Sequence, residues 1–343
     1  MKKLSVVLKV ITPMLSFGND MENSEFRITE LKALMRSTFR ELYYFNDIKD
    51  MKEKEDKLFG SVNRKSPISF KLNNIDKKSF GKVNMLPHKQ MPKVSCIKES
   101  SKIYIDIITK NNVYIPIYAI LLIQASITGA LGKRSRKGFG SFIIESMLLN
   151  GEDEYKDLLI GKPEDILENC NKFILDKDLK DLGEYILGIN KDGVNNEIVI
   201  NKLSSNLDYP YVKKISFIKI CDKEYMGLIK KISQLTHDRL RKKDNKKGNE
   251  EDFTDGIENN QEIKRTILGN CKGEKCGMKR FASPVSISFW ENSDEKYMVI
   301  KELNYNYILQ KLNIRNDKSL KANDEYVQKY IKELKDIGGN DKK

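Results

Sequence analysis

A glycine-rich segment, residues 129–144, gathers four cationic side chains within five positions. Its sequence is GALGKRSRKGFGSFII, and the cations are Lys133, Arg134, Arg136 and Lys137. Glycines such as Gly132 and Gly138 adopt left-handed backbone dihedrals without strain and let another chain come close. Four like charges at this spacing repel one another unless an anion neutralises them, and a ribose-phosphate strand is such an anion. The segment therefore predicts a loop that binds nucleic-acid phosphates, with a mobile basic surface loop as the alternative.

The spacing excludes two other kinds of phosphate-binding loop. A Walker A loop needs Gly-Lys followed by Ser or Thr, between a strand and a helix. Here Gly132-Lys133 is followed by Arg134, and the predicted order is helix, loop, strand. A dinucleotide fingerprint needs a third glycine at position 143, which is isoleucine. The loop therefore suits a long polyanion better than a single nucleotide.

A row of basic residues lies beside the apolar stripe of a predicted helix at 27–45. The stripe consists of Ile28, Leu31, Met35, Phe39 and Leu42. The basic row consists of Lys32, Arg36 and Arg40, which share one side of the helix at ~100° per residue. Glu30 and Glu41 fall on the far side, so the row has one sign of charge. We expect the stems to pack on the core and the charged ends to face a groove, although a solvated helix face would have the same pattern.

Composition points to an anionic partner and a reducing compartment. The 343 residues carry 62 Lys and Arg against 49 Asp and Glu, a net charge of +13, which suits a nucleic acid or an anionic membrane surface. The odd number of cysteines, five, does not resemble a secreted disulfide framework.

The apolar run at 1–18 is interrupted by Lys9 and predicts a strand rather than a signal peptide. The run at 113–127 is too short to span a bilayer, so we expect a cytoplasmic protein.

Hydrophobic patterning in the first half predicts a four-stranded sheet with two helices. The predicted strands are 4–12, 66–72, 102–109 and 139–145, and the predicted helices are 27–45 and 113–130. Segments 49–57 and 73–98 read as a charged connection and a long irregular loop. The order β-α-β-β-α-β is the ferredoxin-like arrangement that RNA-recognition modules share.

The second half predicts a degenerate copy of the same unit. Residues 151–210 read as an acidic, helix-rich connector, and residues 241–256 are a polar run typical of disorder. Predicted strands at 212–221, 281–290 and 296–304 and helices at 223–243, 257–268 and 324–337 follow that connector. RKSPISFKL at 64–72 is echoed by RFASPVSISF at 280–289. The predicted fold class is α+β, with ferredoxin-like domains at 1–150 and 211–343 and no obvious fourth strand in the second.

Several of these segments resemble a known family. EFRITELKALMRSTFREL at 25–42 is similar to the E-L-R-P-P-S-I-K-G-x-L-R-x-W-x-R segment of the first RAMP subunit of type III-B CRISPR (Cmr) effector complexes. VITPMLSFGND, LFGS with KSPISF, LGKRSRKGFGS and RFASPVSI also match, in the family's order. The chain departs from the family at Ile28, Thr29, Ala33 and Thr38, which stand for two prolines, a glycine and an aromatic residue.

The resemblance implies a RAMP protein with two ferredoxin-like domains that binds RNA without cutting it. Partners would be the 3′ part of a guide RNA, its paired target RNA and the other RAMP subunits of the complex, in antiviral defence. The family's basic positions fall on Arg27, Lys32, Arg36 and Arg40, and the late motif adds Arg280 to the candidates. No cofactor and no catalytic residue are implied.

Three alternatives remain open from the residues. RAMP-type ribonucleases that process guide RNA commonly use histidine as acid or base, and the chain has only His88 and His237. Cys271 and Cys276 have a spacing within the range of zinc ligands, but no second pair lies nearby. A scaffold that contacts only protein would also fit, and it would show no salt-dependent binding of RNA.

Overall fold

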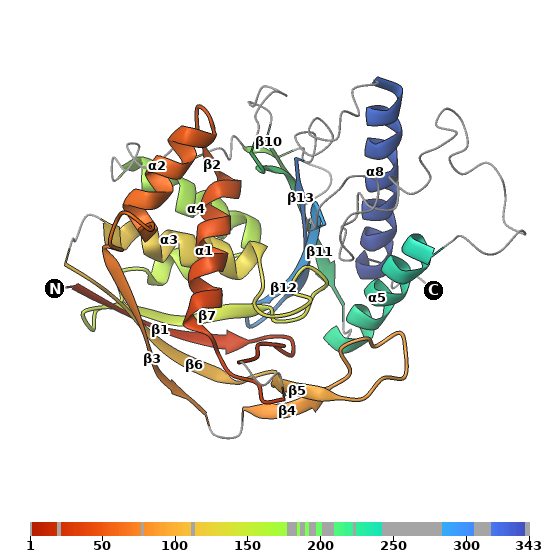
Figure 1. The fold of residues 1–343 in the computed structure, drawn as a ribbon, viewed down its shortest axis with the longest axis horizontal. Helices are drawn as coiled ribbons and strands as arrows, with labels where there is room; N and C mark the ends of the chain where they lie inside the picture. The colour runs from red at the N-terminus through yellow and green to blue at the C-terminus, as the bar shows by residue number, and fades with distance from the viewer. Residues whose placement is uncertain are drawn as a thin grey trace, which may run out of the picture.

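The computed structural model has two antiparallel sheets with helices packed between and around them (Figure 1). It describes residues 2–18, 22–76, 79–110, 114–176, 184–185, 189–191, 197–200, 209–221, 224–241, 283–304 and 317–339. Apart from Arg241, the run predicted to be disordered at 241–256 lies outside these residues. The predicted helix at 257–268, Arg280 and the Cys271/Cys276 pair lie outside them as well.

The first sheet confirms the predicted β-α-β-β-α-β order. Its strands are β1 (Lys2–Val10), β3 (Ile68–Ile75), β6 (Lys102–Thr109) and β7 (Phe142–Leu149), in the spatial order β3-β6-β1-β7. In the central strand β1, Val6 lies opposite Ile105 of β6 and Met147 of β7, and all pairs are antiparallel. Leu4, Val6, Leu8 and Val10 alternate with less buried residues, so one face of the strand packs into the core.

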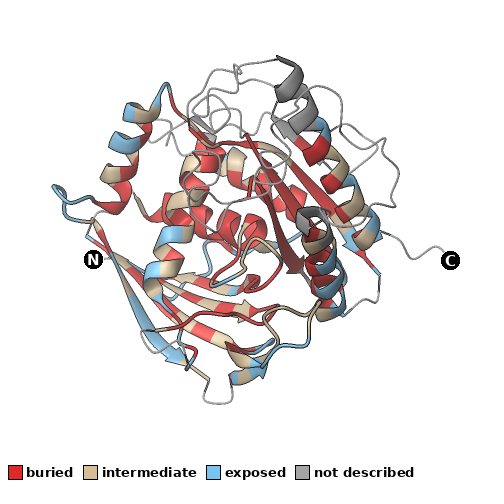
Figure 2. Cartoon of the chain, turned by 45° about the vertical axis from the view of Figure 1, so that its right-hand side comes forward, coloured by how far each residue is buried: buried red, intermediate tan, exposed pale blue. Residues whose placement is uncertain are grey.

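Two helices of very different character cover this sheet. Helix α1 (Ile28–Leu42) buries the predicted stripe of Leu31, Met35, Phe39 and Leu42. Helix α3 (Ile115–Thr128) is apolar all round, and every residue after Pro116 is buried because α1, α4 and both sheets contact it. Figure 2 shows the buried residues filling these central layers. Among the described residues, no helix has the length and apolar character needed to cross a membrane.

The second sheet repeats the strand order of the first. Its strands are β12 (Val285–Glu291), β13 (Lys296–Leu303), β11 (Val212–Ile220), β10 (Glu197–Ile200) and β9 (Ile189–Lys191), in that spatial order. Helices α5 (Tyr225–Arg241) and α8 (Asp317–Gly339) accompany it. Strand β12 occupies the place that β3 has in the first sheet, as the sequence echo suggests. The fourth place is held by β10, which comes from the segment predicted to be a helical connector.

The remaining described elements include two segments that correct the predictions. The segment expected as a charged connection is helix α2 (Ile48–Phe59), whose N-terminal Asp47 accepts hydrogen bonds from Lys49 N and Asp50 N at 2.8 Å each. The segment expected as a long loop contains the hairpin β4 (Phe80–Val83) and β5 (Val94–Ile97). The remaining elements are β2 (Tyr43–Tyr44), β8 (Glu184–Tyr185), 3₁₀-helix η2 (Lys156–Leu159) and α4 (Pro163–Asp176).

The glycine-rich loop between α3 and β7 joins the two sheets. Gly140 N donates to Pro13 O at 3.0 Å and Lys133 N donates to Leu15 O at 2.8 Å, which fixes the loop to the segment after β1. Toward the other sheet, Gly138 N donates to Ile287 O at 3.1 Å, and Ile287 N donates to Arg136 O at 3.2 Å. The loop therefore covers the edge strand β12, so that edge is not open to other chains.

The glycines of this loop make room for the protein's own backbone. Gly132, Gly138 and Gly140 have φ of +83°, +89° and +71°, in the left-handed region that favours glycine. A Cβ at Gly132 would lie 2.7 Å from Leu15 O, and one at Gly140 would overlap the Leu131 carbonyl oxygen. These glycines therefore make room for protein atoms, and the assignment of Gly132 and Gly138 to RNA binding stays a prediction.

We predict that Gly140→Ala lowers the free energy of unfolding by at least about 2 kcal/mol, because the left-handed conformation and the carbonyl overlap both penalise a Cβ. Gly227→Ala is the matched control: Gly227 lies in α5 with nothing within 4 Å of the added atom, and the change should stabilise by up to about 1 kcal/mol. Urea denaturation of both variants measures the difference. Equal stabilities would contradict the role of the loop as a rigid joint.

Candidate nucleic-acid interface

The four cations of the loop do not form one cluster. Lys133 is exposed, and Arg134 is half-buried with φ of +59°. Arg136 turns inward, where its Nη1 donates to the Ser283 carbonyl beside the second sheet. Lys137 donates from Nζ to the Tyr330 hydroxyl at 3.1 Å and lies over that ring. Protein groups of the second half therefore partly satisfy two of the four charges, those of Arg136 and Lys137.

The structure brings Arg27 and Lys133 together, although they are far apart in the sequence. Arg27 stands at the start of α1, with its side chain 45% exposed, and its Nη1 lies 3.5 Å from Phe17 O. Lys133 Nζ lies 4.9 Å from the centroid of the Phe17 ring. No side chain caps the N-terminus of α1, so its first backbone N–H groups add partial positive charge at the same place. Phe17 was not among the sequence candidates, since nothing in its neighbourhood distinguishes it from a core aromatic.

The basic row on α1 is present, but an acid from another helix neutralises part of it. Glu55 of α2 has a side chain only 4% exposed and accepts hydrogen bonds from Arg36 Nε and, at 2.6 Å each, from Arg40 Nε and Nη2. Lys32 Nζ donates to Ser66 Oγ at 3.1 Å. The expectation that acids are kept away from the row was therefore wrong in three dimensions. The arginine side chains remain 30% and 38% exposed, so the ion pairs do not bury either of them fully.

The ion pairs also set the ionisation of the row. Burial alone would raise the pKa of the Glu55 carboxyl, but hydrogen bonds from Arg40 and Arg36 outweigh it and lower that pKa. The hydrogen bond to Glu55 raises the pKa of Arg40. Burial, together with the neighbouring Arg36 charge, lowers the pKa of Lys32. The carboxylate therefore holds both guanidinium groups in fixed orientations.

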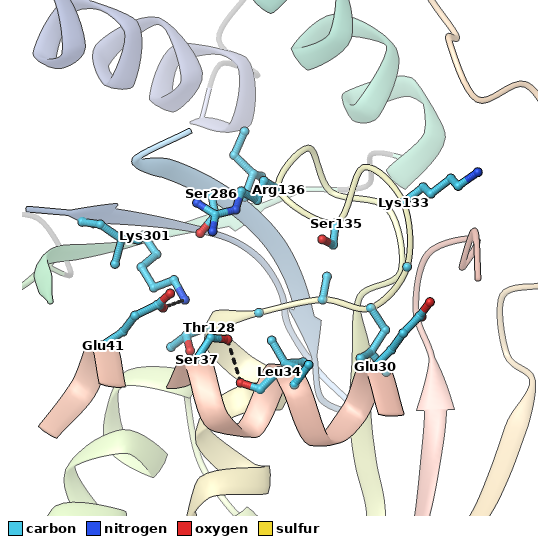
Figure 3. Close-up of a pocket in the computed structure, with 17 residues that line it drawn as sticks. Glu30, Leu34, Ser37, Glu41, Thr128, Lys133, Ser135, Arg136, Ser286 and Lys301 are labelled. Atoms are coloured by element: carbon cyan, nitrogen blue, oxygen red, sulfur yellow. Dashed lines mark hydrogen bonds and ion pairs between the residues drawn. The ribbon is translucent and has the colours of Figure 1, made fainter. Parts of the chain in front are cut away.

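The basic row and the glycine loop lie on different sides of α1. The side of α1 that faces the loop carries Glu30, Ala33, Leu34, Ser37 and Glu41. These residues form one wall of a groove of about 400 Å³, whose other walls are the loop and strands β12 and β13 (Figure 3). Glu41 and Lys301 close one end of it with a buried ion pair of 2.5 Å that links α1 to β13. Arg27, at the N-terminal end of α1, is therefore the basic candidate of this helix that lies near the loop. The basic row of Lys32, Arg36 and Arg40 lies on the other side of the helix.

The structure gives little support to a metal site or to catalysis by histidine. Among the described residues no group of three His, Cys, Asp or Glu side chains could hold a metal ion. His88 and His237, distant in sequence, lie against each other with ring centroids 4.7 Å apart, and His88 Nδ1 is 2.6 Å from Ser233 Oγ. The Nε2 atoms of both rings are buried. No local sequence pattern predicts that the two rings meet.

We predict that Glu55→Gln lowers the free energy of unfolding at pH 7 by about 1–2 kcal/mol, because two guanidinium groups lose a charged acceptor. The folded-state pKa of Glu55 lies below its unfolded value, so its stabilisation is complete above the unfolded pKa and is lost as pH falls through the folded one. Urea titrations at pH 7 and at about pH 3 should therefore show the deficit and then a smaller one.

Glu53→Gln on the same helix is the control, since Glu53 is 69% exposed and pairs only with Lys57 at i,i+4 among the ion pairs of the described residues. It should change stability by less than about 0.5 kcal/mol. A Glu55→Gln effect no larger than the control, or one that persists unchanged at low pH, would contradict the role given to this carboxylate.

Comparison with known proteins agrees with the resemblance read from the sequence. Residues 7–143 match the model of the RAMP superfamily. The CRISPR system Cmr subunit Cmr1-2 of Pyrococcus furiosus is 41% identical over 64 residues, 18% of this chain and 34% of that protein. The aligned segment thus spans about a third of the curated relative.

Solved structures extend the likeness in fold to most of the chain. Cmr1 from Pyrococcus furiosus in its apo form matches with a TM-score of 0.56 and 17% identity, over 89% of this chain and 88% of that one. A chain from a type III-B Cmr-beta complex bound to cognate target RNA matches more loosely, with a TM-score of 0.48 and 12% identity over 91% and 99% of the two chains. Residues 7–143 therefore resemble the RAMP superfamily, and the fold of most of the chain is similar to that of Cmr1.

Proposed function

We propose that this protein is an RNA-binding, non-catalytic subunit of a type III-B Cmr effector complex, where it holds the 3′ part of the guide RNA and its paired target. The single observation that carries the proposal is the group formed by Arg27, Phe17 and Lys133 at the open N-terminus of α1. Its cations come from two segments that are distant in sequence, and both contact the same phenylalanine. The likeness to Cmr1 supports the choice of complex.

The chemistry of this group suits a phosphate backbone. A guanidinium, an ammonium and the N–H groups at a helix start each favour an anion, and the two cations contact the same phenylalanine, while Arg27 Nε also lies 3.8 Å from Glu25 Oε1. Contacts to phosphate position an RNA strand without reading its sequence. Arg36 and Arg40, whose side chains are partly exposed, and Lys32 would bind further phosphates of the same RNA strand along the opposite side of α1. We include Arg134, Gly132 and Gly138 in the proposed interface because they shape the loop. Arg280 remains a prediction from the resemblance.

The ribonuclease alternative is disfavoured by the surroundings of the two histidines. A general acid or base must reach the proton that it transfers, directly or through one water. The facing rings of His88 and His237 bury both Nε2 atoms, and His88 Nδ1 lies within hydrogen-bond distance of Ser233. Neither ring lines the groove beside the loop. We therefore propose binding without cleavage, and localisation in the cytoplasm with the other RAMP subunits.

We predict that the full-length chain binds single-stranded RNA with an affinity that falls steeply as salt rises. Lys133→Ala should reduce the slope of log K against log salt by about 0.7, the change expected for one lost phosphate contact on a single strand. Arg27→Ala should do the same, and neither change should depend on RNA sequence. Fluorescence anisotropy across a salt series measures the slopes.

Lys172→Ala is the matched control, because it removes the same charge from the exposed face of α4, outside the interface. Its slope should equal that of the unmodified chain. Equal slopes for Lys133→Ala and Lys172→Ala would rule out the proposed phosphate site. Absence of salt-dependent binding in the unmodified chain would favour a scaffold that contacts only protein.

A further inference from the structure

The groove between α1, the glycine loop and the second sheet has the features of a site for a planar, uncharged group. Its volume is about 400 Å³, and Lys133, at the proposed phosphate site, lies on its rim. The apolar residues Leu34, Leu131 and Leu303 contribute to its lining. Arg136, held by the Ser283 carbonyl, contributes a guanidinium, and such planes stack on nucleobases (Figure 3).

Two polar atoms of the groove walls lack a hydrogen-bond partner among the described residues. Glu30 lines the groove, and one of its carboxylate oxygens, Oε2, is buried without a hydrogen-bond partner among the described residues. The Ser286 hydroxyl, on a residue only 9% exposed, is also buried without such a partner. Buried polar atoms in folded proteins are normally hydrogen-bonded, so these two indicate that a polar ligand completes the site.

Charge decides which part of an RNA strand can enter. The Glu41 carboxylate is neutralised by Lys301, whereas Glu30 has no ion pair among the described residues. A bare carboxylate repels a phosphate but accepts hydrogen bonds from the N–H groups of a base. The phosphates would therefore stay on the rim near Lys133, and the base edge would face Glu30. A guanine places two donors, N1–H and N2–H, side by side, and these match the two oxygens of one carboxylate.

We propose that the groove accepts one unpaired nucleobase of the bound RNA and that Glu30 favours guanine there. This inference rests on the proposed function, because the phosphates on the rim bring the base to the groove. The apolar walls and the Arg136 plane hold the faces of the base, and Glu30 accepts from its Watson–Crick edge. Ser286 lies within the same lining and supplies a hydroxyl that can donate or accept.

The test compares two 12-nucleotide RNAs bound to the full-length chain, one all uridine and one with a single central guanosine. Fluorescence anisotropy should give about tenfold tighter binding of the guanosine oligonucleotide, the discrimination typical of a bidentate contact. Ala33→Trp fills the groove from an exposed position on α1, and it should reduce the ratio to about one. Glu30→Gln should also reduce the ratio to about one, and it keeps the test decisive if the tryptophan disturbs folding.

Ser69→Trp is the control, a neutral change to tryptophan at an exposed position of β3 that should keep the tenfold ratio. A ratio near one in the unmodified chain, with steep salt dependence intact, would overturn the base site and leave the phosphate site standing. A tenfold ratio retained in Ala33→Trp or Glu30→Gln would also overturn it. Loss of salt-dependent binding to both oligonucleotides would instead overturn the proposed function itself.

Discussion

The close approach of backbone to backbone in the α3–β7 loop is the constraint on which the rest of the structure depends. Pro13 and Leu15 accept hydrogen bonds from the loop on the side of the first sheet, and Ile287 pairs with it from the second. Within the loop, Leu131 N donates to Gly140 O. At positions 132, 138 and 140 the backbone is left-handed and an added Cβ would lie too close to neighbouring atoms, which explains why glycine occupies them. The loop is therefore as much a part of the core as the strands it joins. Its position fixes α1 relative to both sheets and so defines the groove.

The fixed backbone of the loop directs its cationic side chains to two different sides. Where the backbone is held against β12, Arg136 and Lys137 reach groups of the second half, and their charges help to join the two sheets. Where the loop passes α1, Lys133 faces solvent beside Arg27. The same principle operates on α1, where the buried Glu55 fixes two arginines that would otherwise be mobile. Cations held in this way lose less conformational entropy when an anion binds.

Much of the first half could be predicted from sequence because local pattern and tertiary structure agree there. The alternation in β1, the stripe on α1 and the apolar run of α3 each specify one buried face or a fully buried helix. The role of Glu55 could not be predicted, because a glutamate in KDMKEKEDK looks like any solvated helix residue. The inward turn of Arg136 could not be predicted either, since it depends on Ser283, 147 positions later. Likewise, no local sequence pattern predicts that β10 pairs with β11 and so joins the second sheet.

Amide hydrogen exchange of the full-length chain tests the rigid loop most directly. If the loop is part of the core, the amides of Leu131, Lys133, Gly138 and Gly140, all hydrogen-bonded to backbone carbonyls, should exchange nearly as slowly as those in the middle of β1. The exposed turn at Val62 and Asn63 gives the fast reference within the same molecule. Exchange of the four loop amides at the rate of that turn would show a mobile basic loop, and would contradict the claim that the joint between the sheets also presents the RNA-binding charges.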